Sequence, residues 1–236
     1  MIYESSIGNL DFWTPYEDRL NTFTKIGINL SAGTDSALVL YMTCRELVDK
    51  PHVTIIPITG VDVLRPTNEW NAKEIVMLMK EWFPTVKFGK HQINKYRKQS
   101  QTDKTRNHVE HENRLRDEGI IEVLFHGRTA NPPTDVAEQN NLLYKRETRR
   151  DVHGNTRIPY HENHGKPFNC PMEYLDKRFA AEQYHKFNLM DDLFPITASC
   201  IAHAAATDYF TKPCKTCWWC REKKWAFGMY DGGVSG

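Results

Sequence analysis

Two apolar runs joined by six small residues constrain this 236-residue chain more than any other feature. The run at 24–30 is short and rich in β-branched residues, which predicts a buried strand. The run at 36–47 is apolar nearly all round, which predicts a buried helix. The turn between them, SAGTDS at 31–36, contains only small or short-chained residues, so the strand enters the helix through a tight bend.

The same alternation continues along the chain. Three further apolar runs that we expect to form strands lie at 52–61, 85–93 and 120–127. Helical patterns separate them, an amphipathic one at 66–83 and a polar one at 106–119. Strands that alternate with helices predict an α/β fold with a doubly wound parallel sheet, in which ligands bind at the carboxyl ends of the strands.

The second half of the chain is less regular. Between 129 and 168 the composition changes to Asn, Pro, Arg, Glu and His without a clear period, which predicts a long functional loop or a partly ordered insertion. An amphipathic helix is expected at 176–189, with Asp176 as its N-cap. The predicted organisation has three parts: an N-terminal extension at 1–23, an α/β domain at 24–190 and a cysteine-containing region at 191–236.

Composition excludes several classes of protein. An apolar fraction of 40% is enough for a buried core, and a formal net charge of +1 gives no global basic field, so direct nucleic-acid binding is not expected. The first 20 residues include acidic ones and lack an apolar core, and no other run approaches the roughly 20 apolar residues of a membrane span. We therefore expect a soluble, cytoplasmic protein without a membrane partner.

The small-residue turn has two interpretations. Small side chains let the backbone approach a ligand, and the N–H groups that converge at a helix N-terminus attract phosphate. Alternatively, Gly33 only permits the bend while Asp35 or Ser36 caps the helix. The turn alone favours the second interpretation, whereas its place between the first strand and the first helix of an alternating fold favours the first. No Gly-Lys-Ser/Thr follows, so it is not a Walker-type loop.

Four cysteines near the C-terminus have the spacing of a metal site. Cys214, Cys217 and Cys220 are each separated by two residues, and Cys200 precedes them at a distance. Two-residue spacing lets successive thiolates face one ion, and a distant fourth thiolate completes a closed, structural zinc site. Thiols of an intracellular protein stay reduced, so metal binding is favoured over disulfides.

The remaining cysteines and the histidine pair at 108 and 111 are not expected to bind a metal. Cys44 lies in the predicted buried helix and is expected to be a packing residue, whereas Cys170 has no evident partner. His108 and His111 stand at helical spacing, which is more typical of a solvated helix face than of a metal site.

Together, the turn and the cysteines resemble one enzyme superfamily. SAGTDS is similar to the Ser-Gly-Gly-x-Asp-Ser loop of the PP-loop, or N-type, ATP pyrophosphatases, with Ala32 in place of the first glycine. The cysteine spacing, the segment CPMEYLDKRFAAE containing Lys177, and the pair Arg106-Asn107 resemble the 7-cyano-7-deazaguanine synthase family over roughly residues 24–228. The resemblance implies an adenine nucleotide α hydrolase fold with a zinc-binding appendage built on four cysteines.

The resemblance also implies a reaction. An oxygen of 7-carboxy-7-deazaguanine attacks the α-phosphate of ATP, pyrophosphate leaves into the loop, and ammonia displaces AMP to give the amide, which a second activation dehydrates to the nitrile. The implied cofactors are ATP, Mg²⁺ and Zn²⁺, and the implied assembly is a homodimer. Both queuosine in tRNA and modified DNA, as in some phage pathways, remain open as destinations of the product.

The residues that the resemblance implies for this chemistry fall into two groups. Lys177 and Arg106 would neutralise charge on the phosphates, and Asp35 would position Mg²⁺ or cap the loop, with Ser36 as a fourth catalytic residue. The implied nucleotide-binding residues are Ser31, Ala32, Gly33, Thr34, Asp35, Ser36, Asn107 and Gly127.

Three departures from the family leave the substrate open. The family's Gln-Arg-His segment is replaced by VLRPTNEW, in which only Arg65 is an equivalent. After Gly127, the family's acidic substrate-contacting segment is replaced by RTANPPTD. The spacer between Cys200 and Cys214 is longer than is usual in the family. The alternatives are a phosphoadenylyl-sulfate reductase-like enzyme, a tRNA-thiolating or lysidine-forming relative, and a zinc-stabilised binding module that has lost catalysis. The reductase alternative requires a reactive cysteine in the C-terminal tail. No cysteine follows Phe227, which argues against this alternative.

Overall fold

A computed structural model describes residues 1–12, 22–97, 101–142, 160–163 and 166–235 of the chain. At 101–106, 160–163 and 166–167 it describes the backbone alone. Within these residues, no helix is both long enough and apolar enough to cross a membrane.

Seven strands form the central sheet of the described part of the chain, in the order β5-β4-β3-β7-β9-β8, with β6 also paired to β4. Their bounds are Lys25–Asn29 for β3, Thr54–Asp62 for β4, Lys87–Phe88 for β5, Gln92–Tyr96 for β6, Val123–His126 for β7, Tyr160–Asn163 for β8 and Lys166–Asn169 for β9. All pairs are parallel except β8 with β9. The predicted doubly wound parallel sheet is confirmed.

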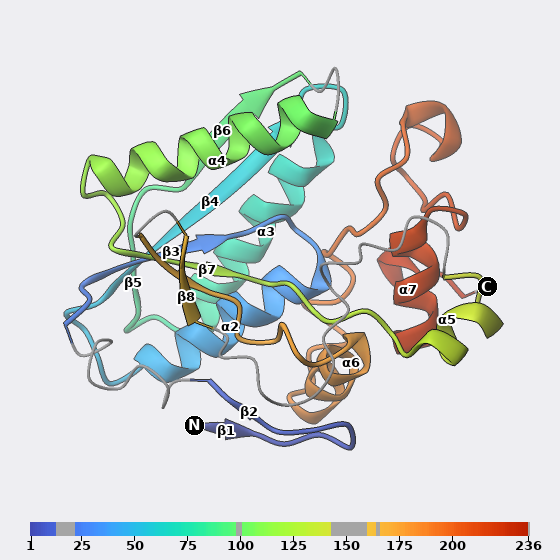
Figure 1. Ribbon diagram of the computed structural model, residues 1–236, viewed down its shortest axis with the longest axis horizontal. Helices are drawn as coiled ribbons and strands as arrows, with labels where there is room; N and C mark the ends of the chain where they lie inside the picture. Colours follow the sequence, from blue (N-terminus) through green and yellow to red (C-terminus); the bar gives the residue numbers. More distant parts are fainter. Residues whose placement is uncertain (13–21, 98–100, 143–159, 164–165, 236) are drawn as a thin grey trace.

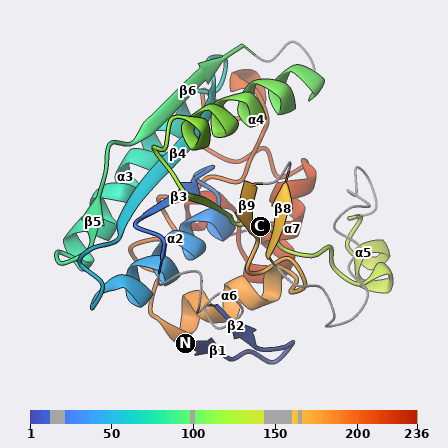
Figure 2. The same cartoon turned by 60° about the vertical axis from the view of Figure 1, so that its left-hand side comes forward.

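Helices cover both faces of the sheet (Figures 1 and 2). Their bounds are Thr34–Leu47 for α2, Thr67–Trp82 for α3, Gln101–Asp117 for α4, Thr134–Gln139 for α5, Lys177–Lys186 for α6 and Trp218–Phe227 for α7. The helices α2 and α3 lie on one face and α4 on the other. Because β3 has β4 on one side and β7 on the other, the topological switch point lies between β3 and β7, beside the turn at 31–36.

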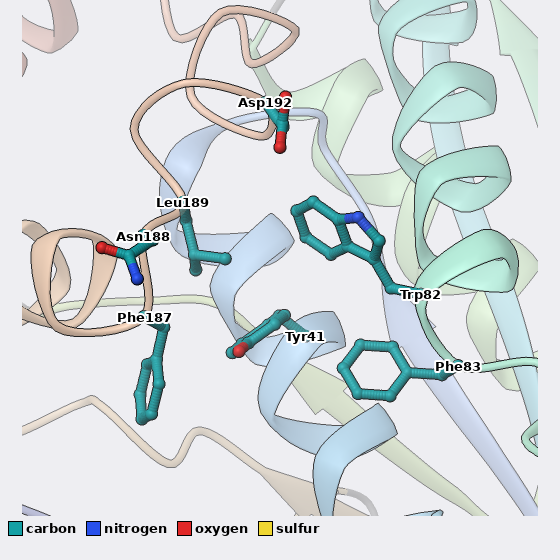
Figure 3. Close-up of a pocket in the computed structure, with 7 residues that line it drawn as sticks. All are labelled: Tyr41, Trp82, Phe83, Phe187, Asn188, Leu189 and Asp192. Atoms are coloured by element: carbon teal, nitrogen blue, oxygen red, sulfur yellow. The ribbon is translucent and has the colours of Figure 1, made fainter.

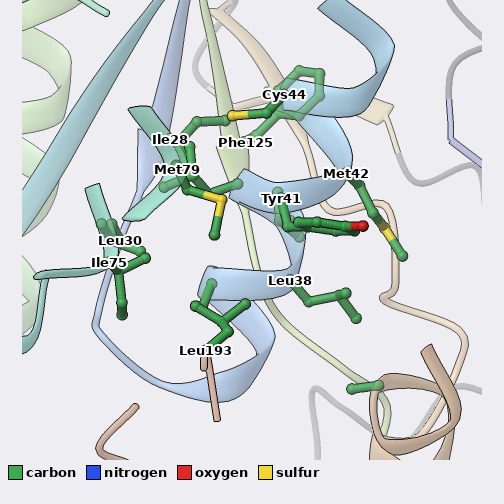
Figure 4. Close-up of a cluster of buried hydrophobic side chains, with 14 of the residues drawn as sticks. Ile28, Leu30, Leu38, Tyr41, Met42, Cys44, Ile75, Met79, Phe125 and Leu193 are labelled. Carbon is green, nitrogen blue, oxygen red and sulfur yellow. The ribbon is translucent and has the colours of Figure 1, made fainter. Parts of the chain in front are cut away.

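The larger hydrophobic core lies between the sheet and α2 (Figure 4). Residues of β3 and β7, such as Ile28 and Phe125, meet Cys44 of α2 and Met79 of α3 there. Cys44 is fully buried, which raises the pKa of its thiol, so it is a packing residue as expected. A smaller core beneath α4 includes Cys170, which is also fully buried.

Two sequence expectations about strands and loops need correction. The run at 85–93 forms two short strands, β5 and β6, instead of one. The segment at 129–168, expected to be a long functional loop or a partly ordered insertion, contains α5 and the β8–β9 hairpin, so the first of these alternatives is wrong; β9 extends the sheet beside β7. Buried Phe168 anchors this strand in the smaller core, which a polar, aperiodic sequence did not reveal. Residues 143–159 of the expected loop lie outside the described residues.

The ends of the described chain pack against the α/β core. In the N-terminal extension, β1 (Ile2–Tyr3) and β2 (Leu10–Asp11) form a hairpin whose Tyr3, Leu10 and Phe12 belong to the larger core. Helix α6 begins after Asp176, whose carboxylate accepts the backbone N–H of Arg178 at 2.9 Å, so the predicted N-cap is confirmed. At the other end, α7 contacts the residues that follow α5, where the indole of Trp218 donates to the Leu142 carbonyl at 2.6 Å.

Gly127 brings the end of β7 into contact with the turn at 31–36. A Cβ atom at Gly127 would lie 2.4 Å from the backbone nitrogen of Ser36 and 2.5 Å from the carbonyl carbon of Asp35. Neither backbone atom has room to move without unwinding the first turn of α2. Only glycine therefore fits at this position.

We expect Gly127→Ala to lower the free energy of unfolding by about 2–3 kcal/mol, because overpacking forces the backbone apart. Gly33→Ala is the matched control in the same turn. Its φ is −77° and the nearest atom to its added Cβ would be 3.6 Å away, so a loss below about 1 kcal/mol is expected. Urea denaturation measures both values, and equal losses would contradict the close approach at Gly127.

Candidate functional site

The turn at 31–36 closes on itself through two hydroxyl groups. The Ser36 hydroxyl accepts the backbone N–H of Ser31 at 3.2 Å and donates to the Gly33 carbonyl at 3.1 Å, and it lies 3.1 Å from the Ser31 hydroxyl. Gly33 is the N-cap of α2 and makes no side-chain cap bond, so the alternative expectation that Asp35 or Ser36 caps this helix is wrong. Residues 34–36 are the first three helical residues, and their N–H groups have no intrahelical acceptor.

Ala32 adopts a left-handed backbone conformation within this turn. Its φ is +65°, it is fully buried, and its carbonyl accepts the N–H of Ala198 at 2.8 Å. The Cβ atom makes this conformation less favourable for alanine than for glycine. The position at which the PP-loop family carries its first glycine is therefore a position that favours glycine in this structure as well.

Lys177 is a buried cation that lies against the turn. It is the first residue of α6, and its side chain is 3% exposed. Its ammonium lies 2.8 and 3.0 Å from the two carboxylate oxygens of Asp35, and 3.4 Å from Glu222 on α7. The structure therefore brings together two of the predicted catalytic residues, Asp35 and Lys177, and adds a third ionisable group.

Two hydroxyl groups also contact the first turn of α2. The Thr129 hydroxyl, just after β7, lies 3.5 Å from the second carboxylate oxygen of Asp35. The Tyr184 hydroxyl of α6 donates to the Thr34 carbonyl at 3.1 Å. Segments far apart in sequence thus hold this part of the helix in place.

The segment 197–200, which ends at the first cysteine of the cluster, lies along the turn. Ala198 donates its backbone N–H to the Ala32 carbonyl of the turn. Ser199 and Cys200 donate their backbone N–H groups to one carboxylate oxygen of Asp231, at 2.8 and 2.7 Å. The other oxygen accepts from Lys223 of α7 at 2.6 Å. Burial lowers the pKa of the fully buried Lys223, while Asp231 acts in the opposite direction. This pair fixes the segment between the turn and the remaining cysteines.

The four predicted metal ligands converge. The sulfur atoms of Cys200, Cys214, Cys217 and Cys220 all lie within 4.8 Å of one another, so the cluster could hold a metal ion. Hydrogen bonds among the neighbouring thiols lower the pKa of Cys217 and raise that of Cys220. If all four were ionised at this distance, their charges would repel one another unless a cation lay among them. Cys217 is also the N-cap of α7, so the cluster fixes the start of that helix.

Other predicted residues lie elsewhere or are not described. The Arg106 side chain lies outside the described residues. Asn107 lies on α4, and its backbone carbonyl accepts a hydrogen bond from the Asn94 side chain of β6. Strand β4 lies between β6 and β3, the strand that leads into the turn at 31–36. Arg65 donates to the Cys200 carbonyl, and burial lowers its pKa.

A polar cluster that the sequence did not predict lies at the ends of β3 and β7. Asn29 and His126 are paired in register at the carboxyl ends of these strands. On α4, His108 lies 3.0 Å from Glu112, whose carboxylate also accepts from the Asn29 amide at 2.7 Å. Burial lowers the pKa of His126 to about 4, so its ring is neutral at pH 7.

The expectation of a solvated face at His108 and His111 is therefore wrong. His111 is buried, and its ring lies 2.9 Å from Arg114. In the sequence, only the i, i+4 spacing of His108 and Glu112 indicated that these two side chains share one face of α4. In the structure this face of the helix contacts the sheet.

A cavity of about 200 Å³ opens between α2, α3 and the end of α6 (Figure 3). Its lining is mainly aromatic and comprises Tyr41, Trp82, Phe83, Phe187, Asn188, Leu189 and Asp192. None of the predicted site residues belongs to it. The cavity is therefore separate from the turn and its charged neighbours.

Comparison with known proteins gives limited information. No family model matches the chain, and no curated protein matches it. Among solved structures, the U34-tRNA thiolase NcsA from Methanococcus maripaludis with its [4Fe-4S] cluster is similar at 14% identity and a TM-score of 0.48. The match covers 86% of this chain and 63% of that one, so the chain spans less than two thirds of that structure. Similarity at this level does not assign a function.

We expect Ala32→Gly to raise the free energy of unfolding by about 1 kcal/mol, because glycine relieves the left-handed strain at this position. Ala37→Gly, in the regular part of α2, is the matched control and should lower it by about 1 kcal/mol. Thermal unfolding followed by circular dichroism measures both. A decrease for both variants would show that Ala32 is not strained.

Proposed function

We propose that the chain is an ATP-dependent enzyme that adenylates a carboxylate and transfers the acyl group to ammonia. The observation that carries the proposal is the turn at 31–36, which places the N-terminus of α2, without a side-chain cap, at the switch point of a parallel sheet, next to buried Lys177. Phosphate binds favourably at such a helix N-terminus. The resemblance in sequence to the PP-loop supports pyrophosphate as the bound group.

The residues of the turn have distinct roles in this proposal. The N–H groups of residues 34–36, with the hydroxyl groups of Ser31 and Ser36, bind the β- and γ-phosphates. A substrate carboxylate oxygen then attacks the α-phosphorus, and the bond to the bridging oxygen breaks as pyrophosphate leaves. Lys177 stabilises the negative charge that develops on the phosphates.

Asp35 supplies an oxygen ligand of the kind that Mg²⁺ prefers. Its side chain is 15% exposed, more than that of Lys177, so solvent reaches the carboxylate more readily than the ammonium. Mg²⁺ bound there would neutralise part of the triphosphate charge. In the second half of the reaction, the lone pair of ammonia attacks the acyl carbon, AMP leaves with the carboxylate oxygen, and the nitrogen loses a proton to water to give the amide.

We propose 7-carboxy-7-deazaguanine as the carboxylate substrate. The support is the combined order of motifs along the sequence, from the turn through Lys177 to the cysteines. The departures at 63–70 and 128–135 fall where the family contacts its substrate. A non-catalytic nucleotide-binding module is the second candidate, favoured by the Ala32 methyl group at the family's glycine position.

We further propose that the cysteine cluster binds a single zinc ion. Four sulfur atoms at about 2.3 Å from one zinc ion are about 3.8 Å apart in a tetrahedron. The sulfur atoms of Cys214 and Cys220 are 3.9 Å apart. An iron–sulfur cluster spreads its cysteine ligands over several metal atoms, which requires larger separations. A closed site with four sulfur ligands is structural.

We expect pyrophosphate release from ATP that depends on 7-carboxy-7-deazaguanine, and Asp35→Asn should reduce it by about 100-fold because charge stabilisation in the transition state is lost. A coupled pyrophosphate assay measures the rate, and mass spectrometry of the product distinguishes amide from nitrile. Asp192→Asn, at the rim of the aromatic cavity, is the control and should keep the wild-type rate. Nucleotide binding without any pyrophosphate release would instead support the binding module.

We expect the purified protein to contain one zinc ion per chain. Elemental mass spectrometry measures the content, and Cys217→Ser should lose the ion together with several kcal/mol of stability, roughly in line with structural zinc sites. Cys44→Ala is the control, because this buried thiol lies in the core and not in the cluster. A folded sample with iron, or with no metal, would contradict the zinc assignment.

A further inference from the structure

Glu222 is a buried carboxylate that the predicted chemistry does not use. It lies on α7, two residues after the metal-ligand candidate Cys220, and its side chain is 1% exposed. Its carboxylate lies 3.4 Å from the ammonium of Lys177. Lys177 therefore has one carboxylate partner in the turn and a second on the helix that begins at the cysteine cluster.

The two carboxylates differ in their access to solvent. Asp35 is 15% exposed, whereas Glu222 is almost completely buried. A cation from solvent can therefore reach the carboxylate of Asp35, whereas protein encloses that of Glu222. Asp35 also makes the shorter contacts to Lys177, at 2.8 and 3.0 Å.

A buried ammonium is stable only while a counter-charge or hydrogen-bond acceptor faces it. If Asp35 turned toward a cation, Lys177 would lose two close contacts at the moment when its charge is needed. Glu222 lies in position to hold the ammonium in that state. The alternative, a lysine that follows Asp35 or moves to solvent, would remove positive charge from the phosphate side of the site.

We propose that Glu222 is a positioning residue that retains Lys177 in the site when Asp35 turns to the cation of a bound nucleotide. This inference rests on the proposed function, because it requires a nucleotide at the turn. It also gives α7 a role beyond metal binding. The cysteine cluster sets the position of Glu222, and Glu222 sets the position of Lys177.

The test compares Glu222→Gln, Glu222→Asp and the wild-type chain in binding a non-hydrolysable ATP analogue, measured by calorimetry with and without Mg²⁺. We expect Glu222→Gln to weaken binding about tenfold with Mg²⁺ and much less without it, since the loss corresponds to one charged contact. Glu222→Asp, which keeps the charge, should restore most of the affinity. In turnover assays the loss in Glu222→Gln should lie mainly in KM for Mg·ATP.

Glu182→Gln on α6 is the control, because this half-buried carboxylate binds Ser6 of the N-terminal hairpin. It should bind the analogue like the wild type. Equal losses for Glu222→Gln with and without Mg²⁺, no loss at all, or no recovery in Glu222→Asp would each overturn the role of Glu222. No binding of the analogue by the wild-type chain would overturn the proposed function and this inference together.

Discussion

The buried ammonium of Lys177 is the interaction on which the arrangement of the site depends. It joins three helices that are distant in sequence: α2 through Asp35, α6 through Lys177 itself, and α7 through Glu222. A charge of this kind is costly to bury and is stable only when its partners are fixed. The fold therefore has to hold all three helices at fixed positions relative to one another, because otherwise Lys177 would lose its carboxylate partners.

The sheet and the segment with the cysteine cluster both fix these helices. The parallel sheet positions the N-terminus of α2 at the end of β3, and Gly127, just after β7, packs directly against it. The cluster lies at the start of α7, and Lys223 with Asp231 ties the segment 197–200 to the same helix. A small helical appendage on an α/β domain thus contributes contacts to the site itself.

Sequence reasoning was most successful where a local pattern determines a local structure. The apolar runs around the turn predicted β3 and α2, Asp176 predicted the start of α6, and the two-residue spacing predicted the cysteine convergence. The β8–β9 hairpin was missed because a polar strand at a sheet edge has no apolar period. Glu222 and the pairing of Glu112 with Asn29 were missed because each depends on a contact between distant segments.

The position of Glu222 two residues after Cys220 has a practical consequence for work with chelators. If the cysteines bind a metal as proposed, its removal would loosen the start of α7, where Cys217 is the N-cap, and with it the position of Glu222 one turn further along. A chelator would then suppress the proposed nucleotide binding through the cysteines, without acting on the proposed cation at Asp35. Inhibition by a chelator during purification or assay would therefore not identify which of the two proposed metal sites had been emptied, unless zinc and magnesium were restored separately.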